Sequence, residues 1–187
     1  MNLKAAFLAC VSALTVGVMP AAVNPAKATP ATGDFNSHLE LYQTIHAYGV
    51  KVLINSPEYC DGRVDGSYIS TLRILNVCQD NARPGEAETT WSENDLDTLR
   101  HEAHHMIQDC AGGGHANGHL VHLFSDRSQL LSFIQNVLGE EEAKRLMTSD
   151  SYQGHNRERQ LIELEAFATA AVISARDITD KMIQVCR

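Results

Sequence analysis

The stretch between residues 92 and 114 carries the start and stop signals of one helix, and this helix constrains the fold more than any other feature of the sequence. Ser92 stands three residues before Asp95, which is a capping arrangement, and further acidic residues in the first turn suit the helix dipole. Three consecutive glycines, residues 112–114, end the pattern. We therefore predict a helix over residues 93–110, in the middle of the chain.

The centre of this predicted helix reads His101-Glu102-Ala103-His104-His105, which matches the pattern H-E-x-x-H. Residues four positions apart lie above one another on a helix face, so His101 and His105 can ligate one zinc ion. Glu102 is then placed to act on a zinc-bound water, whose pKa falls to about 7, and to take its proton during attack on a carbonyl. His104 faces away from the pair, and we assign it a structural role.

A catalytic zinc needs a third protein ligand and an open position for water. The metzincin pattern would supply a histidine six residues after His105, but Ala111 stands there, and Gln108 replaces the glycine of that pattern. A carboxylate from a second helix is the other common solution. The spacing of apolar residues predicts a long helix over residues 157–175, which can provide it.

Residues 165–169 of that helix read Glu-Ala-Phe-Ala-Thr, which resembles the Glu-Gly-Phe-Ala-Thr segment that carries the third zinc ligand in aminopeptidase N-like gluzincins. The resemblance covers this helix and the H-E-x-x-H helix, and it implies a zincin-like zinc metallopeptidase. It implies the following roles: His101, His105 and Glu165 as zinc ligands, Glu102 as the general base, and Thr169 as a group that orients a ligand histidine.

Glu163 is the alternative third ligand, because a small residue follows it three positions later, as one follows Glu165. Phe167 stands four positions after Glu163 and cannot orient a ligand, whereas Thr169 holds that place after Glu165. A third interpretation treats both glutamates as solvated charges on an amphipathic helix. The sequence therefore predicts Glu165 and leaves Glu163 open.

Four residues are candidates for a hydrogen-bond donor to the oxyanion of a tetrahedral intermediate. Tyr152 and His155 come just before the predicted ligand helix, and His115 and His119 follow the three glycines. For the two histidines after the glycines, and for the nearby His122, an ordinary loop or surface role is the simpler interpretation.

The first 28 residues have the layout of a secretory signal peptide: one lysine, an apolar run over residues 5–19, and the end Ala26-Lys27-Ala28. Pro20 breaks the run short of the roughly 20 residues that a membrane span needs. We therefore expect cleavage after Ala28, no membrane attachment afterwards, and a secreted or periplasmic location. Residues 29–36 are predicted to be a tether, and residues 37–187 one domain.

Four cysteines remain once Cys10 leaves with the signal peptide, and an even number suits disulfides in an oxidising compartment. Three pairings are possible, and a zinc site built from these thiols is the rival interpretation, although no C-x-x-C spacing occurs. We predict Cys60 with Cys78, which would staple a local hairpin, and Cys110 with Cys186, which would tie the C-terminus to the central helix.

The predicted architecture is α+β and helix-dominated, with a small antiparallel β-hairpin. The best strand signal covers residues 67–77, and residues 50–54 read as a strand or as the last turn of a helix over 37–47. Two more helices are predicted, one reaching residue 138 and one over residues 140–147.

We expect a secreted zinc-dependent metallopeptidase that acts on peptide or protein substrates. The alternative is a non-catalytic zinc-stabilised binding module, in which His115 or His119 would close the water position. The formal net charge of −8 argues against a nucleic-acid partner. The sequence does not address the oligomeric state.

Overall fold

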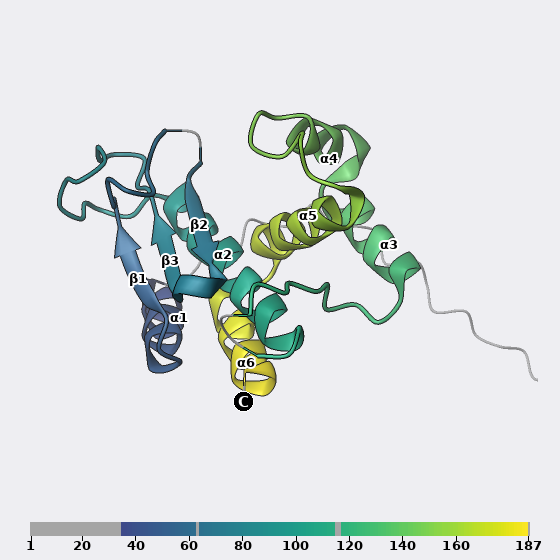
Figure 1. Ribbon diagram of the computed structural model, residues 1–187, viewed down its shortest axis with the longest axis horizontal. Helices are drawn as coiled ribbons and strands as arrows, with labels where there is room; N and C mark the ends of the chain where they lie inside the picture. The colour runs from purple at the N-terminus through teal and green to yellow at the C-terminus, as the bar shows by residue number, and fades with distance from the viewer. Residues whose placement is uncertain (1–34, 63, 115–116, 187) are drawn as a thin grey trace, which may run out of the picture.

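The computed structural model describes residues 35–186 except residues 63 and 115–116 (Figure 1). The predicted signal peptide and most of the predicted tether lie outside the described residues, so both stay predictions. Phe35 and Asn36, the last two residues of the predicted tether, already belong to the first helix, α1 (Phe35–Ala47).

A three-stranded mixed sheet follows α1, with the strand order β1-β3-β2. The strands β2 (Gly66–Ile69) and β3 (Ile74–Val77) pair antiparallel, as the predicted hairpin requires. β1 (Lys51–Ile54) adds a parallel strand on the other side of β3. The single strand expected over residues 67–77 is broken by a 3-10 turn (Ser70–Leu72), after which Arg73 takes a left-handed conformation with φ of 53° and reverses the chain.

Most of the helices begin where capping residues stand. Ser92 and Asp95 form the expected capping box of α2 (Glu93–Ala111), and Asp126 caps α3 (Arg127–Val137), which is followed by α4 (Gly139–Met147). The long helix predicted over residues 157–175 is present as α5 (Arg157–Val172) and ends three residues earlier, and a further helix, α6 (Ala175–Val185), follows that was not predicted. The chain is extended at Ile173, and Ser174 caps α6.

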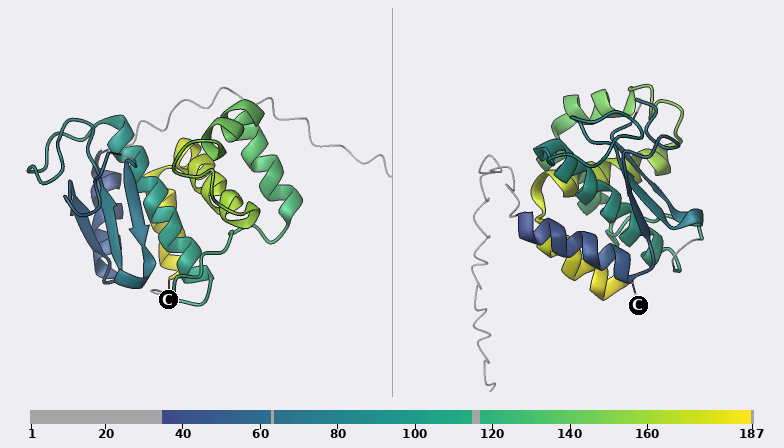
Figure 2. Two further views of the ribbon diagram at one scale, coloured as in Figure 1. Left: turned by 45° about the horizontal axis from the view of Figure 1, so that its top comes forward. Right: turned by 90° about the vertical axis from the view of Figure 1, so that its left-hand side faces the viewer.

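Helix α2 lies between the sheet and α5, and it contacts both (Figure 2). Two hydrophobic clusters follow from this arrangement. The first joins the sheet to α1, α2 and α6, and the second joins α3 and α4 to one side of α5. Figure 2 shows α1 and α6 side by side below the sheet. The packing therefore places α2 and α5 against each other at the boundary between the two clusters.

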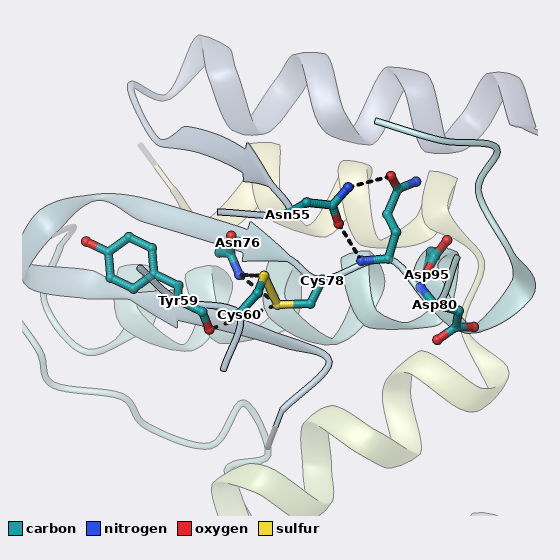
Figure 3. Close-up of a disulfide and its surroundings, with 8 residues drawn as sticks. Asn55, Tyr59, Cys60, Asn76, Cys78, Asp80 and Asp95 are labelled. Atoms are coloured by element: carbon teal, nitrogen blue, oxygen red, sulfur yellow. Dashed lines mark hydrogen bonds between the residues drawn. A yellow bond between two sulfur atoms is a disulfide. The ribbon is translucent and has the colours of Figure 1, made fainter. Parts of the chain in front are cut away.

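Both predicted disulfides are present. The bond between Cys60 and Cys78 ties the loop before β2 to the end of β3, and Asn76 Nδ2 lies 3.2 Å from each sulfur (Figure 3). The bond between Cys110 and Cys186 joins the C-terminal end of α2 to the end of α6. Among the described residues, no helix is both long and apolar enough to cross a membrane.

Candidate metal and catalytic site

Helix α2 brings together three side chains that could hold a metal ion. Possible ligand atoms of His101, Glu102 and His105 all lie within 4.8 Å of one another, and the three residues are buried. The Nε2 atoms of the two histidines are 3.1 Å apart, as the spacing of four residues on one helix face requires. The structure therefore forms the cluster that the H-E-x-x-H pattern predicted.

Helix α5 contributes Glu163 to this cluster. Its Oε2 atom lies 3.1 Å from His105 Nε2 and 3.7 Å from His101 Nε2, and its Oε1 atom accepts a hydrogen bond from Arg159. The three converging atoms are His101 Nε2, His105 Nε2 and Glu163 Oε2. The point equidistant from them in their plane is about 1.9 Å from each atom, slightly less than the zinc-to-ligand distance of roughly 2.0 to 2.2 Å. The three donor atoms therefore fit a tetrahedral metal with little rearrangement.

The structure does not bring Glu165, the favoured third ligand, to the histidine pair. Glu165 is fully buried, and it accepts hydrogen bonds from the backbone N–H of Leu123 at 2.9 Å and from Gln108 Nε2 at 3.2 Å. Its nearest histidine is His104, at 3.4 Å. The reason is geometric: residues two positions apart on α5 point to opposite sides of the helix.

Two related expectations concern Thr169, expected to orient a ligand histidine, and the alternative in which both glutamates are solvated charges. Thr169 lines a cavity beside His104 and Glu165, away from the pair that it was expected to orient. Neither Glu163, 3% exposed, nor Glu165, 0% exposed, is the solvated charge of the third interpretation.

Gln108 is the orienting residue that the sequence analysis missed. Its Oε1 atom lies 2.7 Å from His105 Nδ1, and its amide group donates to Ile162 O and to Glu165 Oε2. Since an amide oxygen only accepts, the proton of a neutral His105 sits on Nδ1, which leaves Nε2 free to ligate a metal. Glu165 thus supports the site through Gln108. The position three residues after His105 on the same helix was the available signal.

The charges of the cluster are strongly coupled. Burial lowers the pKa of His105, but the charge and hydrogen bond of Glu163 outweigh it and raise that pKa to about 9. Despite its burial, Glu163 is held well below its ordinary pKa by the two histidines. Burial dominates at the other two groups, because it lowers the pKa of His101 to about 4 and raises the pKa of Glu102 to about 7. Metal-free protein therefore holds an ion pair between His105 and Glu163.

Strand β2 lies very close to Glu102 at Gly66. A Cβ atom at Gly66 would lie 2.5 Å from Thr98 Cγ2, 2.9 Å from Asn76 O and 3.1 Å from Glu102 Cγ. Tyr68, two residues after Gly66 in the same strand, makes a backbone hydrogen bond to the Glu102 carboxyl group. The absence of a side chain at Gly66 thus lets the strand lie directly against the carboxylate.

A small cavity of about 90 Å³ opens at Glu102 and His101, and Tyr152 lines it. The Tyr152 ring packs edge-on against Phe167, whose ring centroid is 4.3 Å from that of His101. Burial raises the pKa of the Tyr152 phenol, so its hydroxyl keeps its proton and can donate it in a hydrogen bond. Of the three candidate oxyanion donors that the structure describes, Tyr152 is the one that lines this cavity.

The other candidate donors lie elsewhere or are not described. His155 packs against Tyr152, with ring centroids 5.7 Å apart, and does not line the cavity. His119 is exposed, and its Nδ1 lies 3.1 Å from Gly112 O. His122 Nδ1 lies 2.7 Å from Phe124 O. His115 falls outside the described residues, so its role stays a prediction.

A larger cleft of about 770 Å³ lies next to the small cavity, and Val64 lines both. Its walls come from three segments: the loop held by the disulfide of Cys60, the strand β2 with Ser67 and Ile69, and residues 149–151 after α4. Among the described residues, strand β2 pairs with β3 alone, so its other edge is available along this cleft.

Comparisons with protein-family models, with curated proteins and with solved structures find no match to this chain. The function must therefore be inferred from the residues and their geometry.

Proposed function

We propose that this protein is a zinc-dependent metallopeptidase in which His101, His105 and Glu163 hold the metal and Glu102 is the general base. The observation that carries the proposal is the convergence of two imidazole nitrogens and one carboxylate oxygen, 3.1 to 3.7 Å apart, beside a second buried carboxyl group, that of Glu102. Two histidines with one glutamate form a known ligand set of catalytic zinc sites. A zinc-stabilised module without turnover would not need Glu102 next to the first ligand.

The chain's own residues divide the chemistry of peptide hydrolysis among them. Bound zinc would supply a Lewis acid that polarises the peptide carbonyl and lowers the pKa of a coordinated water. Glu102 accepts the proton of the attacking water and passes it to the leaving amine. Tyr152, a protonated donor at the same cavity, stabilises the negative charge that develops on the carbonyl oxygen. Gln108 holds His105 in the required tautomer.

The substrate we propose is an extended peptide segment. The large cleft runs along β2, and an extended chain can pair with the available edge of a sheet through main-chain hydrogen bonds. The cleft meets the small cavity at Val64, so a peptide in it would present a carbonyl group near Glu102. The two disulfides favour an oxidising compartment, and we propose that the protein acts outside the cytosol.

The test compares the purified, disulfide-bonded protein with the variant Glu102→Gln. Metal content would be measured by mass spectrometry after zinc loading, and cleavage would be measured on a mixed peptide library. We expect one zinc per chain in both proteins, and cleavage at least 100-fold slower in Glu102→Gln, since a missing general base costs about that factor. Glu158→Gln is the matched control, because Glu158 is an exposed residue of α5 that pairs with Arg127, and it should retain full activity.

Two outcomes would contradict the proposal. Zinc binding without cleavage by the wild type would favour the non-catalytic zinc module. No zinc binding at all would mean that the cluster of His101, His105 and Glu163 is a structural ion-pair network.

A further inference from the structure

Asp65 lies where the small cavity at Glu102 and the large cleft come together. The residue before it, Val64, lines both spaces, and the residue after it, Gly66, lies against Glu102. Asp65 itself lines the small cavity, and it is exposed to solvent. A peptide that extends from the large cleft to Glu102 therefore passes the Asp65 side chain.

The Asp65 carboxylate is free to pair with a substrate. Its backbone carbonyl accepts a hydrogen bond from Cys78 N at 2.8 Å, but within the described part of the chain its side chain has neither a hydrogen bond nor an ion pair. The small cavity has two other acidic residues. Asp97 is already paired with the Arg100 guanidinium, and Glu102 is the proposed general base. Asp65 is thus the acidic group of this cavity that is left to interact with a bound molecule.

The charge of Asp65 acts on the groups proposed to carry out the reaction. Burial is the main cause of the raised pKa of Tyr152, and the charges of Glu163, Glu102 and Asp65 raise it further. Charge interactions weaken with distance, so this effect places Asp65 near the proposed oxyanion donor. A side chain next to the cleaved bond can therefore reach the Asp65 carboxylate.

The walls of the large cleft carry charge of the same sign. Glu58, Asp61 and Asp150 line it and are exposed, and none of its described lining residues is a lysine, an arginine or a histidine. In the small cavity, the one such residue described is His101, a proposed metal ligand. Arg63 lies outside the described residues and adds one positive charge to this part of the sequence, so the balance stays negative. Walls of one charge attract a ligand of the opposite charge and repel one of the same charge.

We propose that Asp65 determines the specificity of the peptidase by pairing with a lysine or arginine side chain next to the cleaved bond. The substrate class is then an extended peptide with basic residues, which the acidic cleft attracts and Asp65 positions. This inference rests on the proposed function, since it concerns the same site. Peptide binding tests it separately, because the charges act whether or not a bond is cleaved.

The first test measures binding without turnover, in the Glu102→Gln protein. Its ligands are acetyl-Ala-Ala-Lys-Ala-Ala-amide and the same peptide with glutamine or glutamate in the central position, each followed by NMR titration of the ¹⁵N-labelled protein. We expect the lysine peptide to bind about fivefold more tightly than the glutamine peptide, as an exposed ion pair predicts, and the glutamate peptide to bind most weakly.

Two further variants in this background test the assignment to Asp65. Asp65→Asn should remove the preference for lysine over glutamine. Asp180→Asn is the matched control, because Asp180 is an exposed residue of α6 that lines neither space, and it should keep the preference. Circular dichroism confirms the fold of each variant. Equal binding of the lysine and glutamine peptides, a preference that survives in Asp65→Asn, or no saturable binding of any peptide would overturn the proposal.

The second test measures cleavage of a mixed peptide library by the zinc-loaded protein. Lysine and arginine should be enriched about fivefold over glutamine directly before or directly after the cleaved bond, and the charge reversal Asp65→Lys should shift the enrichment to glutamate. Cleavage without a basic preference would contradict the role of Asp65 and leave the metallopeptidase standing. No cleavage at all would contradict the proposed function, and the binding series would then decide the role of Asp65 by itself.

Discussion

Replacing Glu163 by glutamine tests which glutamate belongs to the metal site. In the metal-free protein, burial lowers the pKa of His105, and the charge and hydrogen bond of Glu163 reverse this and raise it to about 9. Without that carboxylate, burial dominates, so we expect the His105 pKa in Glu163→Gln to fall below its ordinary value of 6.5. A drop of more than two units corresponds to at least about 3 kcal/mol of lost interaction with the imidazolium.

The matched control is Glu165→Gln, which removes a charge two residues away but keeps an oxygen that can accept from Gln108. The largest effects on the His105 pKa come from burial, Glu163, Glu102 and Gln108, so we expect the loss of the Glu165 charge to change that pKa by less than about half a unit. The assay follows the ring carbon signals of each histidine by NMR as a function of pH in metal-free protein. If His105 still titrates near pH 9 in Glu163→Gln, or falls equally in both variants, the assignment of Glu163 is wrong.

Three further predictions concern the pH dependence of zinc affinity, the packing of β2 at Gly66 and the disulfide between Cys110 and Cys186. Because a proton on His105 competes with the metal, zinc affinity in a chelator competition should rise about tenfold per pH unit from pH 7 toward the His105 pKa of about 9 and then level off. Gly66→Ala should lower the free energy of unfolding in urea by about 1–3 kcal/mol, since the new Cβ would lie 2.5 Å from Thr98 Cγ2. Replacing Cys110 and Cys186 by serine opens a loop with a sequence separation of 76 and should cost about 4–5 kcal/mol in the same assay, and a loss below 1 kcal/mol would contradict the loop-entropy argument.

Sequence signals that act within a few residues were sufficient to predict the helix starts and the histidine pair. The start of α2 follows from Ser92 and Asp95, and the start of α3 follows from Asp126, because a capping side chain acts within a few residues. The His101 and His105 pair also follows from helix geometry alone. These features could be predicted because no distant contact is needed to specify them.

The features that the sequence did not predict depend on distant contacts or on uncommon backbone conformations. The reversal between β2 and β3 uses Arg73 at φ of 53°, where a glycine or asparagine would have marked the turn. The break between α5 and α6 has no proline or glycine, and only the cap at Ser174 marks it. The parallel pairing of β1 with β3 joins strands that are separated by β2 in the sequence.

The choice between Glu163 and Glu165 also depends on a distant contact, the packing of α5 on α2. The two residues lie on opposite faces of α5, so the docking angle of α5 on α2 decides which one meets His105. An exposed polar face would have indicated that angle, but α5 is buried almost all round between the two hydrophobic clusters. The likeness of residues 165–169 to a gluzincin segment could not replace this missing information.

The energetics of Glu102 support a chemical role over a structural one. Its folded pKa of about 7 lies above the ordinary value of 4.5, so ionisation of this group costs the fold nothing below pH 4.5, and the cost grows as the pH rises from 4.5 through 7. Near neutral pH the carboxyl group therefore costs stability, and buried charges are in general poor sources of it. A residue kept at such a cost, beside two histidines and against Gly66, which has no side chain to displace it, fits the proposed reaction, which needs a carboxylate able to gain and lose a proton.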